Sequence, residues 1–137
     1  MTFADLPRNR PDPLQPPLGI LDVCAREMAA AYYAPDGVEP PWPRLGANTR
    51  ERFYRTAEIG IIAAKDHRRA HGGMTIPPEG LARMLCAAWF DQDADPIKRR
   101  LRFGAFSAFE RQRWVGCARA MIAAGQRWAA ENGKAAA

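Results

Sequence analysis

Apolar residues recur along this chain at helical spacing, and the pattern predicts helices only. Stripes of residues three, four or seven positions apart run through residues 18–33, 48–71, 77–90 and 107–131. No segment alternates apolar and polar residues with a period of two, so no strand is expected. The chain is therefore predicted to be all-α, an irregular bundle of four main helices with a short basic helix at residues 97–103.

Glycine, proline and polar residues predict where these helices begin and end. Pro35 stops the first helix, Gly72-Gly73 the second, and Asn132-Gly133 the last. Residues 48–51 (Asn-Thr-Arg-Glu) and 107–110 (Ser-Ala-Phe-Glu) resemble capping boxes, in which a polar side chain accepts a hydrogen bond from an amide three residues later. Two of the helices are therefore expected to start with a side-chain cap.

The helical pattern is repeated. Residues 28–33, an alanine-rich helix end with two aromatics, have an echo in residues 85–90. The stripe of Phe53, Ala57, Gly60, Ile61 and Ala64 recurs at the same spacing as Trp114, Ala118, Met121, Ile122 and Gly125. Residues paired by these two alignments are called equivalent. A repeat of this kind sets the architecture and predicts two related helical hairpins, residues 18–71 and 77–133.

One helical domain, residues 18–133, accounts for most of the chain. Residues 1–17 hold five prolines and are predicted to form an extended, flexible arm, and residues 134–137 a tail. The stripes converge on a predicted core of Leu21, Met28, Tyr32, Phe53, Ala57, Ile61, Leu81, Leu85, Trp89, Trp114, Ala118, Ile122 and Trp128.

The composition is typical of one folded, globular domain and argues against a membrane-spanning protein. The 137 residues are 47% hydrophobic and 26% charged, and no apolar run approaches the roughly 18 residues that span a bilayer. Residues 1–7 lack the pattern of a signal peptide, so a soluble, cytoplasmic protein is expected. The three cysteines stand apart in apolar segments, which is typical of small core residues.

The charge is modestly basic, with a net +5 that is unevenly distributed. Residues 44–69 carry a net +4 and residues 96–113 a net +5. Such clusters can dock on an acidic protein surface or, with nearby aromatics, contact phosphates and stack bases. Because Phe53 and Trp114 already belong to the apolar stripes, stacking is not needed to explain them. The predicted partner-binding residues are Arg50, Arg55, Lys98, Arg99, Arg100, Arg102, Arg111 and Arg113.

Candidate metal and catalytic residues are few. His67 and His71 lie one helical turn apart, but arginines separate them and no third ligand is evident. Residues 91–95 open like a calcium loop, yet Pro96 and Arg102 stand where the loop needs Gly and Glu. With no phosphate-binding glycine loop and no nucleophile paired with a base, no enzyme activity, metal or cofactor is expected.

Three short motifs follow one another in the first half: Ala25-Arg26 in the first helix, Trp42-Pro43-Arg44-Leu45 in the connection, and Arg50-Glu51-Arg52-Phe53 in the second helix. In this combination residues 21–64 resemble small, largely uncharacterised helical proteins common in phage and prophage genomes. Phe103 and Phe106 replace the tryptophan and leucine in the second half. The resemblance implies an accessory role in a mobile element, where such proteins often bind and redirect host proteins, including those of antiviral defence.

The leading hypothesis is therefore a non-enzymatic accessory protein that inhibits or adapts a host protein with an acidic surface. DNA or RNA binding through the same basic helices is the alternative. Because alanine-rich helices with exposed aromatics can pair with another copy, a homodimer also stays open.

Overall fold

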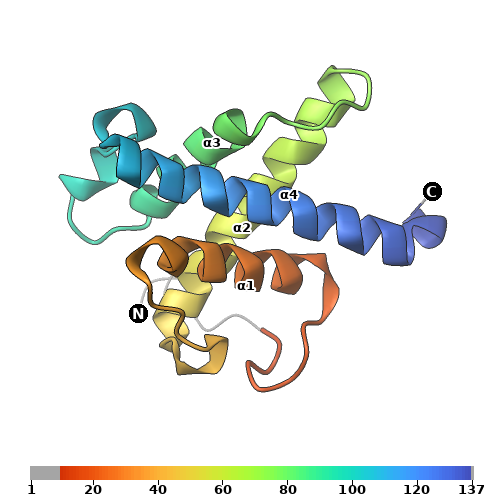
Figure 1. Cartoon of the computed structure of the whole chain (residues 1–137), viewed down its shortest axis with the longest axis horizontal. Helices are drawn as coiled ribbons and strands as arrows, with labels where there is room; N and C mark the ends of the chain where they lie inside the picture. The colour runs from red at the N-terminus through yellow and green to blue at the C-terminus, as the bar shows by residue number, and fades with distance from the viewer. Residues whose placement is uncertain (1–9, 137) are drawn as a thin grey trace.

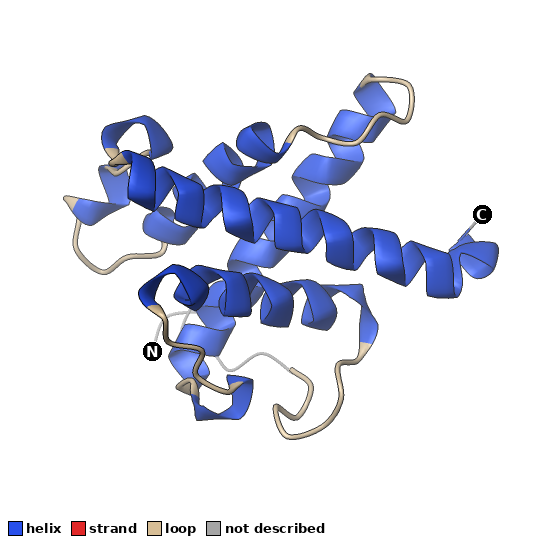
Figure 2. Cartoon of the chain, in the orientation of Figure 1, coloured by secondary structure: helices blue, strands red, loops and turns tan. Residues whose placement is uncertain are grey.

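The structure, a computed structural model, describes residues 10–136, with side chains to residue 133. Its α-helices are α1 (Gly19–Tyr33), α2 (Ala47–Ala70), α3 (Pro78–Asp91) and α4 (Ala108–Ala136). Single 3-10 turns lie in the connections: η2 (Ala34–Asp36), η3 (Trp42–Arg44), η4 (Lys98–Arg100) and η5 (Phe103–Ala105). Residues 10–136 contain no strand, which confirms the all-α prediction (Figure 2).

The four helices form a bundle in which each long helix contacts helices of both halves. α4 runs between α1 and α3, and α2 crosses behind it (Figure 1). α1 packs against α2 of its own half and against α4 of the other, and α3 packs against α4 and α2 in the same way. The two hairpins therefore share one core.

Aromatic rings fill the centre of that core. Phe53 and Trp89 have ring centroids 4.7 Å apart, and Trp114 lies 5.9 Å from Trp89 and 5.5 Å from Tyr32. Of the predicted core residues, Leu21, Tyr32, Ile61, Ile122 and Trp128 are half-buried and the others are buried. At Gly60 side chains of α3 and α4 approach the α2 backbone closely, because a Cβ there would lie 2.7 Å from Leu85 Cδ2 and 2.9 Å from Met121 Cε.

The two halves repeat their elements as the sequence predicts. The η3 and η5 turns begin at equivalent residues, as do α2 and α4. Side-chain contacts repeat as well: Arg26 lies 5.8 Å from the Trp42 ring, and its equivalent, Arg83, lies 4.9 Å from the ring of Phe103. The ion pairs Asp22–Arg26 and Glu79–Arg83 are equivalent too. These matched contacts support the two-hairpin description.

The two expected capping boxes have different outcomes. Ser107 Oγ accepts a hydrogen bond from the Glu110 amide at 3.3 Å, as predicted. The prediction at Asn48 is wrong, because α2 already begins at Ala47 and its N-cap, Gly46, provides no side-chain bond. The Glu51 carboxylate instead pairs with Arg10 and Arg55.

The short basic helix predicted at residues 97–103 is replaced by the turns η4 and η5. Leu101 and Arg102 between them are extended. Arg99 donates to the main-chain carbonyls of Asp93 and Ala94, at 2.7 and 3.1 Å, which folds the chain back after one turn. The segment is therefore a tethered loop.

The prediction for the end of the last helix is also wrong. α4 continues through Asn132 and Gly133 to Ala136, so residues 134–136 are not a separate tail. Asn132 Nδ2 donates to the Trp128 carbonyl within the helix instead of ending it. A glycine inside a helix is only about 1 kcal/mol less favourable than an alanine, and residues 134–136 contain no proline that would end the helix.

The proline-rich arm is docked where the structure describes it. Arg10 pairs with Glu51 at 2.9 Å and lies 4.5 Å from the centre of the Tyr54 ring. Arg26 donates to the carbonyl of Asp12. The prediction of a flexible arm is thus wrong for the segment beginning at Arg10, and residues 1–9 lie outside the described residues.

Candidate binding site

The connection within each half, residues 34–46 or 92–107, lies at the same end of the bundle (Figure 1, gold and teal). At this end the start of α4 contacts the end of α1, and the start of α2 contacts the end of α3. We call this end, with its two connections, the connection end. It carries most of the predicted binding residues, so its geometry decides which of them can reach a partner.

Arg113 fastens the two halves together. Its guanidinium donates to the Tyr32 carbonyl, to Asp36 at 2.8 and 3.0 Å, and to Glu110 at 3.2 Å. The hydrogen bonds from Arg113 hold the pKa of the Asp36 carboxyl below its usual range. Because Arg113 is only 5% exposed, its placement on the basic binding surface is corrected: it is a buried internal clamp.

Arg52 forms the reciprocal clamp. It donates to the Trp89 carbonyl at 2.7 and 3.0 Å, pairs with Asp93 at 3.4 Å, and lies 4.1 Å from the centre of the Trp89 ring. Arg52 is equivalent to Arg113, and its partners Trp89 and Asp93 are equivalent to Tyr32 and Asp36. Neither clamp was predicted from the sequence, although both arginines and both aspartates recur at the two offsets of the repeat.

Three more of the predicted arginines have internal partners. Arg50 donates to the Leu45 carbonyl, and its equivalent, Arg111, donates to the Phe106 carbonyl at 2.6 Å. Arg55 pairs with Glu51 at 3.1 Å. These side chains hold the starts of α2 and α4 in place. Arg55 is paired with a carboxylate, whereas Arg50 and Arg111 keep their charge but are tethered to main-chain carbonyls.

The basic connection of the second half contains the remaining candidates. Arg102 pairs with Asp91 at 3.0 Å and, like Arg99, donates to main-chain carbonyls. The side chains of Lys98 and Arg100 are exposed and form no hydrogen bond or ion pair with any described residue. Ile97, beside them, is 77% exposed. The structure therefore places two available cations next to an exposed aliphatic side chain.

The equivalent connection of the first half has the opposite character. Residues 37–41 read Gly-Val-Glu-Pro-Pro, whereas the equivalent residues 98–102 read Lys-Arg-Arg-Leu-Arg. Glu39 thus occupies the position that Arg100 has in the second half. The two halves thus share the arginine and aspartate of the clamps, whereas their exposed connections differ in charge.

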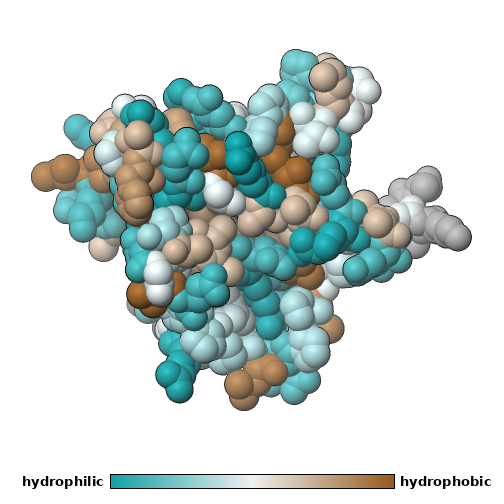
Figure 3. All heavy atoms as spheres, viewed as in Figure 1, coloured by the Kyte–Doolittle hydropathy of each residue, from teal (hydrophilic) through white to brown (hydrophobic). Residues whose placement is uncertain are grey.

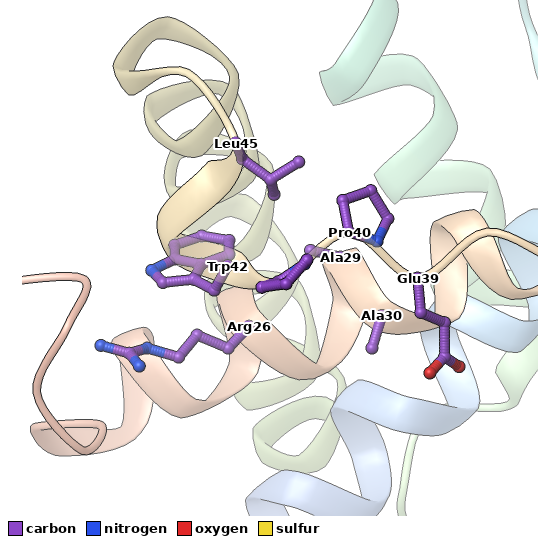
Figure 4. Close-up of a pocket in the computed structure, with 8 residues that line it drawn as sticks. Arg26, Ala29, Ala30, Glu39, Pro40, Trp42 and Leu45 are labelled. Atoms are coloured by element: carbon purple, nitrogen blue, oxygen red, sulfur yellow. The ribbon is translucent and has the colours of Figure 1, made fainter.

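A pocket of about 270 Å³ lies between α1 and the first connection (Figure 4). Ala29, Ala30, Pro40, Pro41, Trp42 and Leu45 give it apolar walls, with Arg26 and Glu39 at opposite ends. Arg26 is held by Asp22 at 3.1 Å, which leaves the Glu39 carboxylate as the available charge. Trp42 is buried, and its Nε1 has no hydrogen-bond acceptor among the described residues.

Among the described residues, other reactive side chains gather in no comparable site. The rings of His67 and His71 stack 4.2 Å apart, and no group of three or more His, Cys, Asp or Glu side chains in the described part of the chain could hold a metal ion. Cys24, Cys86 and Cys117 are buried thiols, and burial raises the pKa of the first two to about 11 and of the third to about 12.

No protein-family model, curated protein or solved structure matches this chain. Within residues 10–136, no helix is both long and apolar enough to cross a membrane. The connection end is therefore the basis for assigning a function.

Proposed function

We propose that this protein is a non-enzymatic binding protein that docks on an acidic protein surface through Ile97, Lys98 and Arg100. The observation that carries the proposal is the contrast among the basic residues: most of the predicted set forms hydrogen bonds or ion pairs within the molecule, whereas Arg100 forms none with a described residue and Lys98 acts on Asp93 only through its charge. Ile97, one of several exposed large hydrophobic side chains, would add apolar contact area beside these cations. Figure 3 shows hydrophobic and hydrophilic residues next to one another at the left edge of the molecule, over the connection end.

The same geometry favours a protein partner over nucleic acid. Electrostatic binding to DNA combines several phosphate contacts from Lys and Arg side chains, and its affinity falls steeply as salt rises. At the connection end, the paired arginines would have to leave Asp36, Glu51, Asp91 or main-chain carbonyls to supply them. Two available cations suit a local acidic patch, and nucleic-acid binding is kept as the competing outcome of the test.

The proposed setting is the cytoplasm of a host cell, with the protein acting as a phage or prophage accessory factor that inhibits or adapts a host protein. Its support is the resemblance of residues 21–64 to such proteins. The docking model does not depend on this setting.

The test is capture from a bacterial lysate by the tagged chain, with and without nuclease, at two salt concentrations. The variant Lys98→Glu/Arg100→Glu reverses the two available cations. Its matched control, Lys65→Glu/Arg68→Glu, reverses two exposed cations near the far end of α2. We expect one discrete protein to survive nuclease, to be lost with the first variant, and to be retained with the control.

Two results would contradict the proposal. Equal loss of the partner in both variants would show that net charge alone governs capture. Recovery of nucleic acid alone, released steeply as salt rises, would assign the basic side chains to phosphate contacts instead.

A further inference from the structure

We infer that the connection end also binds a second copy of this chain, with Ile97 of each copy entering the Trp42-lined pocket of the other and Arg100 facing Glu39. The inference rests on the proposed binding role of residues 97–100 and adds the pocket as their receptor. Three observations support it: the chemistry of the pocket, the exposure of Ile97, and the placement of both at one end of the bundle.

The pocket has room for a side chain. Its volume of about 270 Å³ lies at the small end of the roughly 300–1,000 Å³ of most small-ligand sites. Its walls of alanine, proline and tryptophan offer apolar contact, and Figure 4 shows the Glu39 carboxylate at one end, away from the Arg26 guanidinium. The side chain best suited to this pocket is therefore aliphatic and has a cation close by; we call such a side chain, with its cation, the guest.

This chain carries such a guest. Ile97 is 77% exposed, so its side chain has no pocket of its own within the molecule. Lys98 and Arg100 follow it on the η4 turn, and neither side chain pairs with a described residue. The guest thus presents an apolar group and two cations together, as the pocket requires.

Guest and pocket are arranged for a reciprocal contact. Ile97 belongs to the second connection and the pocket to the first, and the two connections lie at the same end of the bundle. Glu39 and Arg100 also occupy equivalent positions in the two halves. A two-fold arrangement of two copies, end to end, would therefore place opposite charges together twice and close on itself as a dimer.

The test is sedimentation equilibrium of the full chain from about 1 µM to about 1 mM, a range that covers weak dimers. We expect a reversible dimer whose dissociation constant rises about tenfold in Glu39→Arg and in Arg100→Glu, since each change puts like charges together at both contacts. Ile97→Asp should weaken it further. Glu131→Arg and Lys65→Glu make the same charge changes at exposed positions elsewhere and should leave the dimer unchanged.

Mixing the two variants gives the decisive result. In an equimolar mixture of Glu39→Arg and Arg100→Glu, both contacts of the mixed dimer pair opposite charges, so association should return. A chain that stays monomeric throughout, a mixture that fails to recover, or controls that weaken the dimer equally would overturn the inference. If the chain is monomeric but Lys98→Glu/Arg100→Glu still loses its lysate partner, the inference fails and the proposed function stands. If the chain dimerises as expected but Lys98→Glu/Arg100→Glu keeps its lysate partner, the proposed function fails and the dimer contact stands.

Discussion

Arginine side chains near the helix ends donate largely to main-chain carbonyls. The last carbonyls of an α-helix lack partners within the helix, and a planar guanidinium can serve several acceptors at once. Arg52 donates in this way to the carbonyl of Trp89 near the end of α3, and Arg113 donates to the carbonyl of Tyr32 near the end of α1. These guanidinium groups keep their charge but are fixed in place by the fold, and the sequence could not show this because the acceptors of Arg52 and Arg113 are far away in the chain.

Trp42 offers a test of one residue against its counterpart in the other half. Its buried Nε1 lacks an acceptor among the described residues, whereas Phe103 occupies the equivalent position without a polar atom. A buried unsatisfied donor costs about 1–3 kcal/mol, which offsets the apolar area lost on replacing indole by phenyl. We expect Trp42→Phe to change the free energy of unfolding by less than about 1 kcal/mol, and Trp42→Ala to lower it by about 3–5 kcal/mol. Urea denaturation measures both, and a loss in Trp42→Phe as large as in Trp42→Ala would show that the indole N–H is satisfied.

The Asp36 carboxylate gives the clamp a pH dependence. Hydrogen bonds from Arg113 lower its pKa in the folded state. A lowered folded pKa contributes stability above the unfolded value, near 4, and that stability is lost as the pH falls through the folded value. Asp36→Asn should thus be less stable than the natural chain at pH 7, and the two melting temperatures should converge as the pH falls below about 4. A gap that stays constant from pH 7 to acid would show that the carboxylate gains nothing from its partner.

At the scale of elements, sequence patterns placed the helices well and the connections poorly. The bounds of α1 and α3 followed from apolar stripes together with Pro35 and Pro78, which act locally. The segment 97–103 failed because its shape is set by Arg99 and Arg102 reaching back to the end of α3. The Asn48 cap failed for a similar reason, since Glu51 of the expected box pairs with Arg10, which is remote in the sequence.

The crossing of α2 with α3 and α4 predicts opposite effects for two glycines. Gly60 lies where a Cβ would meet Leu85 and Met121 below 3.0 Å, whereas at Gly116 in α4 nothing lies within 4 Å. Alanine gains about 1 kcal/mol over glycine in a helix, but overpacking a buried contact costs about 1–3 kcal/mol. We expect Gly60→Ala to lower the free energy of unfolding by about 1 kcal/mol and Gly116→Ala to raise it by about 0.5–1 kcal/mol. Equal stabilisation in both variants, measured by urea denaturation, would mean that the helices at Gly60 have room to separate.

At the scale of the whole molecule, each half is held in place by contacts with the other half. Each half supplies one arginine clamp and one receptor for the clamp of the other, made of a helix-end carbonyl and an aspartate shortly after it. The sequence repeat predicted two similar hairpins, but similarity alone could not show that α1 packs on α4 and α2 on α3. That exchange places the aromatic core between the halves and both connections at one end.

This arrangement predicts that the chain holds together when the link between its halves is cut. Gly72 and Gly73 are exposed, have positive φ and belong to neither helix, so a protease site inserted between them should not disturb the fold. After cleavage of the folded protein, the two pieces should coelute with unchanged helical circular dichroism. Their unfolding should become dependent on concentration, because refolding is then bimolecular. The variant Arg52→Gln/Arg113→Gln removes both clamps, including their hydrogen bonds to the carbonyls of Trp89 and Tyr32, so its cleaved form should separate into its pieces. Cleaved Arg68→Gln/Arg69→Gln, altered at the exposed end of α2, should stay associated; separation of this control or of the natural chain would show that the covalent link, and not the clamped core, joins the halves.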